Sequence, residues 1–173
     1  MKLKGKKVAI LAENLYEDLE LWVPHYRLKE EGAEVTIVGS GSAKTYSSKH
    51  GYPVEVGREA KEVDISAYDG LVIPGGYSPD LMRRSPEMVR LVKEADAKKK
   101  VVAAICHAGW MLASADILKG RKATGFFSIK DDMVHAGAVY LDQEVVRDGN
   151  LITSRKPDDL PAFCRELIAA LAG

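Results

Sequence analysis

One cysteine occupies a position from which nucleophiles are commonly presented. Cys106 follows the apolar run Val101–Ile105 and precedes a predicted helix. A residue at such a strand-to-helix turn is held so that its side chain points outward, as in the nucleophile elbow of serine hydrolases. The amides and positive dipole end of the helix favour thiolate over thiol, which predicts a pKa below the usual value of about 8.5. The alternative is a small buried hydrophobe, a role that suits Cys164 beside Phe163.

Two further ionisable residues are expected near this thiol. His107 follows Cys106 directly, and neighbours in a regular helix point about 100° apart, so the residues alone leave open whether the imidazole is a base. Glu17 begins the first predicted helix, where a carboxyl normally complements the helix dipole. If Glu17 faces the sulfur, two acids share one site, and this carboxyl would keep a proton and act as donor and acceptor at a carbonyl. Asp18 and Glu20 are expected to face water.

A glycine pair ends another predicted strand. Leu71–Ile73 is followed by Pro74-Gly75-Gly76, and the N–H groups of residues without Cβ could point at a developing oxyanion. On its own the pair indicates only a turn. Neither cysteine belongs to a CxxC motif, and no His/Cys cluster has zinc-ligand spacing, so we expect two free thiols and no metal site.

Alternating elements must position these residues. Helical patterns alternate with short apolar runs. In the first helix Leu19, Trp22, Val23 and Tyr26 recur at helical spacing, and Pro24 is expected to kink this helix or to lie within its first turns. Strands are expected at 8–11, 35–38, 71–73, 101–105 and 138–141, hairpins around 50–53 and between 144–146 and 151–153, and helices at 17–31, 86–98, 107–118, 129–136 and 160–171.

This alternation predicts a single domain over residues 1–173, with an α/β fold and a mostly parallel sheet between helices. In open α/β sheets the site lies at the carboxyl ends of the strands. Glu17, Gly75-Gly76 and Cys106-His107 each follow a predicted strand. We therefore expect them to converge.

The composition of the chain limits the classes of partner that are expected. Lys plus Arg and Asp plus Glu each number 25, so the net charge is zero and nucleic acid is a poor candidate. No segment approaches the roughly 18 apolar residues of a membrane span. The apolar stretch Val8–Ala12 is too short for a signal-peptide core, so a cytoplasmic protein is expected.

Three segments together resemble the PfpI family. They are residues 104–107 around the cysteine, 73–76 around the glycine pair and 16–20 around Glu17, and further matches run over nearly the whole chain. These proteins are intracellular and cysteine peptidase-like, in the superfamily that includes the Parkinsonism-associated deglycase. The resemblance implies a flavodoxin-like three-layer sandwich related to class I glutamine amidotransferases.

The resemblance also implies roles for residues. Cys106 would be the nucleophile and Glu17 its protonated partner, with an oxyanion site formed by amides around Gly75, Gly76 and the His107-Ala108 segment. In PfpI-type proteins the histidine is completed by an acid from a neighbouring subunit, which here matches Asp80. Homodimers or larger homo-oligomers with the site at an interface are therefore implied.

Two positions depart from the family pattern. Many relatives follow the Cys-His pair with Gly-Pro, whereas this chain has Ala108-Gly109-Trp110. Where some relatives carry a tyrosine near the thiol, this chain has Phe126. A mechanism that needs a phenol hydroxyl at that point is not expected here.

Three functions remain open. The leading prediction is an enzyme that adds Cys106 to a small aldehyde such as methylglyoxal, moves a proton through Glu17 and releases a hydroxy acid without a cofactor; on glycated amino groups this would be deglycation. The second is a cysteine peptidase or amidase using Cys106, His107 and, in trans, Asp80. The third is a thiol redox sensor or a stress-response chaperone.

Overall fold

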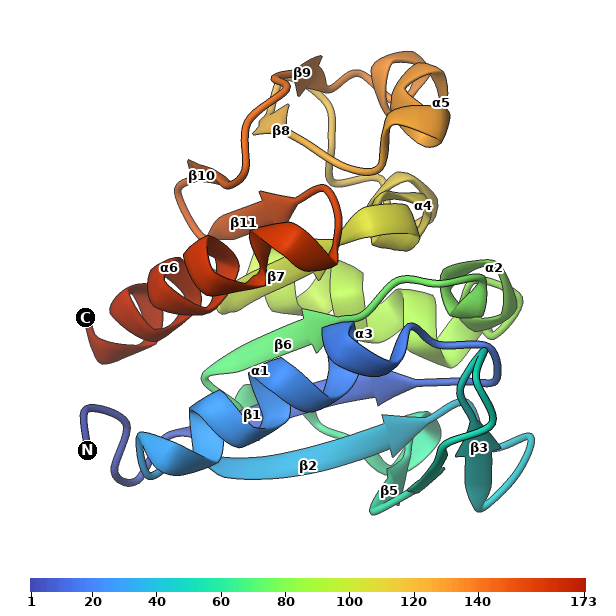
Figure 1. Ribbon diagram of the computed structural model, residues 1–173, viewed down its shortest axis with the longest axis vertical. Coiled ribbons are helices and arrows are strands. Elements are labelled where there is room, and N and C mark those ends of the chain that lie inside the picture. Colours follow the sequence, from blue (N-terminus) through green and yellow to red (C-terminus); the bar gives the residue numbers. More distant parts are fainter.

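Strands and helices alternate around one central sheet (Figure 1). The computed structural model describes residues 1–173. The strands are β1 Lys7–Ala12, β2 Glu34–Gly39, β3 Thr45–Ser47, β4 Pro53–Glu55, β5 Arg58–Glu59, β6 Gly70–Ile73, β7 Val101–Ile105, β8 Lys122–Ala123, β9 Val139–Tyr140, β10 Val146–Asp148 and β11 Leu151–Ser154. The helices are α1 Asp18–Glu30, α2 Ser78–Met82, α3 Pro86–Ala97, α4 Gly109–Ser114, α5 Lys130–His135 and α6 Leu160–Ala172, with short 3-10 helices η1 Ala60–Glu62, η2 Ile65–Ala67, η3 Cys106–Ala108, η4 Phe127–Ile129 and η5 Pro157–Asp159.

The central sheet has seven strands in the order β10-β11-β7-β6-β1-β2-β5. Every neighbouring pair is parallel except β10 with β11. Helices α1 and α6 pack on one face and α3 and α4 on the other (Figure 1). The expected three-layer α/β fold is confirmed. Because β6 lies between β1 and β7, the carboxyl ends of these three strands are neighbours.

Most expected elements are present, with instructive differences. The hairpin around 50–53 is β3–β4, and β10–β11 form the second hairpin. The helix expected at 107–118 begins with η3, and α4 ends at Ser114, since Asp116 has a φ of 56° that a helix cannot continue through. The strand expected at 138–141 pairs as β9 with β8, outside the central sheet. No helix is both long and apolar enough to cross a membrane.

Helix α1 buries a face that its apolar spacing did not indicate. Its buried residues are Glu20, Leu21, Pro24 and Leu28. Of the apolar residues that suggested the helix, Leu19 is 52% and Tyr26 60% exposed, whereas Trp22 and Val23 are half-buried at the edge of the core.

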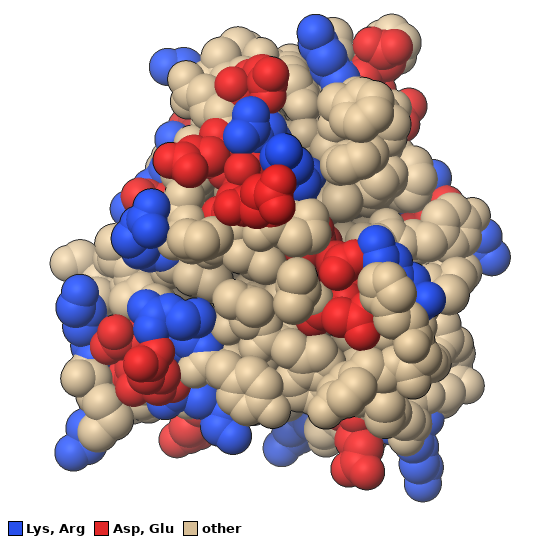
Figure 2. All heavy atoms as spheres, in the orientation of Figure 1, with Lys and Arg blue, Asp and Glu red and all other residues tan.

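The outward face of α1 is aromatic. The Trp22 ring stacks on Tyr26 at 5.8 Å and meets the edge of Tyr52 from the β3–β4 hairpin at 5.6 Å. Figure 2 shows a broad area without charged side chains on the side of the molecule that carries α1. The helix therefore presents an aromatic surface to solvent and a carboxyl, that of Glu20, to the interior.

Candidate active site

The corner after β7 holds the cysteine in an unusual backbone conformation. Cys106 has a φ of 62°, in the left-handed region that residues other than glycine rarely adopt. Such a conformation costs of order 1–3 kcal/mol and persists only where the surrounding structure enforces it. The side chain is directed into a cavity although the residue is only 7% exposed. The strained corner predicted from the sequence is present.

This corner also brings two sequence neighbours into contact. The Sγ of Cys106 lies 3.1 Å from Nδ1 of His107, a contact that regular helical geometry would not give. The other ring nitrogen of His107 lies 3.3 Å from Oγ of Ser128, in η4. Burial, and secondarily the charge of Lys49, lowers the pKa of His107. A neutral imidazole in contact with a thiol is suited to accept its proton.

Aromatic rings form one wall of the cavity. The His107 ring stacks on Phe126 at 4.7 Å and meets the Trp110 ring at 5.1 Å. Trp110 is in turn fixed by a 2.8 Å hydrogen bond from its Nε1 to Asp132 and by Arg83, which lies 4.8 Å above the ring. The two positions that depart from the family pattern, 110 and 126, therefore both line the site and orient the histidine.

A buried carboxyl lies beside the thiol, and it belongs to Glu20. Glu20 is fully buried, and its Oε2 accepts a 2.8 Å hydrogen bond from the N–H of Gly75. A Cβ placed on Gly75 would lie 2.4 Å from that oxygen and 2.7 Å from Cβ of Cys106, so both side chains flank the same side of the glycine. The second oxygen, Oε1, is buried without a protein partner. The expectation that Glu20 faces water is wrong, because this residue is on the buried face of α1.

Glu17 lines the same cavity but is paired to a cation. It is the N-cap of α1, where its side chain accepts a hydrogen bond from the N–H of Leu19. Its carboxylate also forms an ion pair with Lys49. Glu17 therefore lines the cavity, while the carboxyl placed against the thiol is that of Glu20.

Burial dominates the electrostatics of the thiol and its neighbour. Burial raises the pKa of Glu20 to about 8, with the Gly75 N–H opposing this and the charge of Glu17 adding to it. Burial also raises the pKa of Cys106 to about 12, with the charge of Glu20 second and the N–H groups of His107 and Gly76 opposing. This direction is opposite to the one predicted from the helix dipole. Because Glu20 holds its proton at neutral pH, its charge is then absent from the surroundings of the thiol.

The raised pKa of Glu20 predicts how stability depends on pH. A carboxyl whose pKa rises from 4.5 to about 8 on folding stabilises the folded state fully below 4.5 and loses that contribution as pH rises to about 8. The loss corresponds to about 5 kcal/mol at most. Urea unfolding at pH 5 and pH 9 should show native protein losing several kcal/mol relative to Glu20→Gln. Parallel pH dependence of the two proteins would contradict the assignment.

The remaining predicted site residues are placed as follows. Gly76, with a φ of 72°, lines the cavity, and Ala108 is buried within η3. Asp80 is not among the residues that line the cavity. Its carboxylate instead binds Arg83 at 2.8 Å and Arg84 at 2.6 Å within the same chain. Of the predicted site residues, Glu17, Gly76, Cys106 and His107 line this cavity within one chain.

Sequence reasoning missed three residues of the site. Glu20 could have been found, because it is four and eight residues from the buried Pro24 and Leu28 and so shares their face of α1. Lys49 and Ser128 carry no local signal. Lys49 is brought in by the β3–β4 hairpin, through a 3.0 Å bond from its N–H to the carbonyl of Tyr16.

The side chains of Glu17, Asp18 and His50 have ligand-type atoms within 4.8 Å of one another. Protein partners already engage them. Asp18 binds His50 at 2.7 Å and Ser48 at 2.6 Å, and Glu17 binds Lys49. The cluster connects the hairpin to the start of α1.

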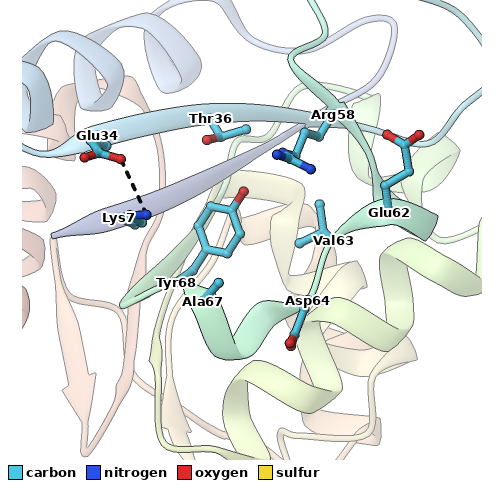
Figure 3. A pocket seen from close by; sticks show the side chains of 9 residues that line it. All are labelled: Lys7, Glu34, Thr36, Arg58, Glu62, Val63, Asp64, Ala67 and Tyr68. Carbon is cyan, nitrogen blue, oxygen red and sulfur yellow. Dashed lines mark ion pairs between the residues drawn. The ribbon is translucent and has the colours of Figure 1, made fainter.

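The cavity that contains the thiol is small, about 330 Å³. Its lining is Glu17, Glu20, Lys49, Gly76, Tyr77, Cys106, His107, Trp110, Phe126 and Pro157. A second cavity of about 330 Å³, shown in Figure 3, lies against β1, β2 and the segment 58–68. It is lined mainly by charged residues, including the Lys7–Glu34 ion pair, and contains no cysteine or histidine. The candidate active site is therefore the first cavity, which contains Cys106 and His107.

The profile of the DJ-1/PfpI family matches residues 6–170. The chain belongs to the DJ-1/PfpI family. It is 44% identical over 165 residues to the deglycase PfpI of Pyrococcus furiosus, covering 95% of this chain and 99% of that protein. It is 42% identical over 167 residues to a Bacillus subtilis protein provisionally named cysteine protease YraA, covering 96% and 99%. Among solved structures, Drosophila melanogaster DJ-1beta superposes with a TM-score of 0.90 at 27% identity, covering 97% and 91%.

Proposed function

We propose that this DJ-1/PfpI protein is a cysteine-dependent enzyme acting on small reactive carbonyls. The observation that carries the proposal is the cavity of about 330 Å³, at the small end for ligand sites, with a thiol, a neutral imidazole and a protonated carboxyl around it. A relative named a deglycase supports the same class of chemistry. The residues present supply nucleophile, base and acid, so the reaction as written uses no cofactor.

The first step is addition to the aldehyde. Nδ1 of His107, 3.1 Å from the sulfur, accepts the thiol proton as Sγ of Cys106 attacks the aldehyde carbon. The imidazolium then returns this proton to the carbonyl oxygen, which becomes a hydroxyl, and the product is a hemithioacetal. The N–H groups of Gly76 and His107 border the thiol, and we expect them to stabilise the developing oxyanion.

The second step moves a proton between carbons. For methylglyoxal, the protonated carboxyl donates its proton to the ketone oxygen and takes up the hydrogen of the hemithioacetal carbon as a proton, which gives an enediol. It then delivers this proton to the former ketone carbon and recovers one from the hydroxyl on the sulfur-bearing carbon, which gives a thioester of lactate. We assign this transfer to Glu20, because a pKa of about 8 suits a group that must accept and return a proton near neutral pH. Water then cleaves the thioester, which releases lactate and the thiol.

A second candidate is a cysteine peptidase, favoured by the Cys106–His107 contact and by the relative named as a protease. In a peptidase of this kind, Asp80 of a neighbouring copy would be the acid that acts with His107. We propose a homo-oligomer for either function. The exposed rings of Tyr26 and Tyr52, which flank the half-buried Trp22, support a second copy as partner.

The test is turnover of methylglyoxal in D₂O, followed by NMR. Native protein is expected to yield lactate, and the isotope at C2 reports the route of the proton: protium marks direct transfer by a shielded carboxyl, and deuterium marks exchange with solvent. A fluorogenic peptide panel runs in parallel. Absence of lactate together with peptide cleavage would replace the carbonyl proposal with the peptidase.

A further inference from the structure

We propose that Glu17 is a positioning residue: held by Lys49, its negative charge keeps the catalytic proton on Glu20. This inference rests on the proposed function, since it states how the proton-carrying carboxyl of that site is kept in its working state. From the sequence, Glu17 was expected to carry the proton itself. Here its task is to keep that proton on Glu20.

The two carboxyls compete for one proton. Glu17 is the N-cap of α1, and Glu20 lies in the first turn of that helix. Both line the cavity that contains Cys106. Two carboxyls in one confined site do not both ionise cheaply, so one of them keeps a proton.

Their surroundings decide which one. Glu17 receives the ammonium group of Lys49 and the N–H of Leu19. Glu20 receives only the N–H of Gly75, and its Oε1 has no protein partner. The negative charge is therefore stabilised on Glu17, and the proton remains on Glu20, beside the thiol.

The hairpin fixes the position of Lys49. Its own N–H binds the carbonyl of Tyr16 at 3.0 Å, and the adjacent Ser48 binds Asp18 at 2.6 Å. Exposed ion pairs usually contribute little. Here the Lys49 side chain is 46% exposed but that of Glu17 only 8%, so loss of the cation would leave a buried charge without a partner.

The other ionisable groups around Glu20 do not offer the same control. On the hairpin side, Asp18 and His50 pair with each other. At the β7 corner, Cys106 and His107 contact each other, and both are uncharged at neutral pH. The charges that remain next to Glu20 are those of Glu17, which raises its pKa, and of Lys49, which lowers it.

Removing the charge of Glu17 or that of Lys49 should therefore shift the titration of Glu20 in opposite directions. Native protein labelled with ¹³C at glutamate carboxyls is titrated by NMR, with Glu20 assigned through Glu20→Gln. Glu17→Gln is expected to move its midpoint to lower pH and Lys49→Met to higher pH, each by about 0.5–1 pH unit. Lys49→Arg, which keeps the cation, and Lys29→Met, on the exposed far end of α1, should leave it in place.

Shifts in the same direction, or an unmoved midpoint in both variants, would overturn the proposal. A structural loss at position 49 is distinguished by Lys49→Arg, which a charge effect rescues. The titration needs no turnover. A protein that shows the opposed shifts but makes no lactate would therefore retain this inference while losing the proposed substrate.

Discussion

Replacing Cys106 with serine is expected to reduce lactate formation from methylglyoxal at least about 10³-fold, because the sulfur forms the covalent intermediate. A hydroxyl is far less acidic than a thiol, and His107 cannot readily remove its proton. The measurement is the initial rate at equal protein concentration.

The matched control for this variant is the second cysteine. Cys164 is buried in α6 within the apolar layer, away from the cavity. Cys164→Ala should keep kcat within a factor of two or three of native protein and affect only stability. Equal rates for native protein and Cys106→Ser would remove the thiol from the mechanism.

Glu20→Gln is expected to lower kcat by about 10²–10⁴, the usual contribution of a positioned acid-base group. Glutamine keeps the size of the side chain and can still accept from the Gly75 N–H, so the change removes chiefly the acidic proton that the carboxyl transfers. Binding of substrate should change little, so the loss is expected in kcat and not in KM.

Two comparisons test whether the loss of activity comes from the missing proton carrier. Iodoacetamide should still alkylate Cys106 in Glu20→Gln, which would show that the site remains formed. Glu17→Gln should retain much more activity than Glu20→Gln at its own optimal pH. The reverse order, with Glu20→Gln active and Glu17→Gln inactive, would restore Glu17 as the proton carrier predicted from the sequence.

The central sheet was predictable because its signals are local. Each parallel strand is buried on both faces and reads as an apolar run, so the predicted 101–105 coincides with β7 and 8–11 lies within β1. The order of strands then places their carboxyl ends together. The convergence of these strand ends near Cys106 followed from this topology.

The assignment of the carboxyl was not predictable in the same way. Glu17 and Glu20 differ in their surroundings through contacts from other elements, namely Lys49 of the hairpin and Gly75 after β6. The pKa of Cys106 likewise depends on burial by those elements, which outweighs the helix dipole. Even for α1, an aromatic stripe at helical spacing marked the outward face, since Trp22 and Tyr26 pack on each other.

The left-handed backbone at Cys106 has a consequence for the engineering of this protein. Glycine adopts that conformation without steric cost, whereas any other residue gives up of order 1–3 kcal/mol. A search for heat-resistant variants would therefore tend to select glycine at this corner and discard the reactive atom. Stability and activity trade against each other at this one residue, so thermostabilising libraries should hold position 106 fixed and vary sites remote from it.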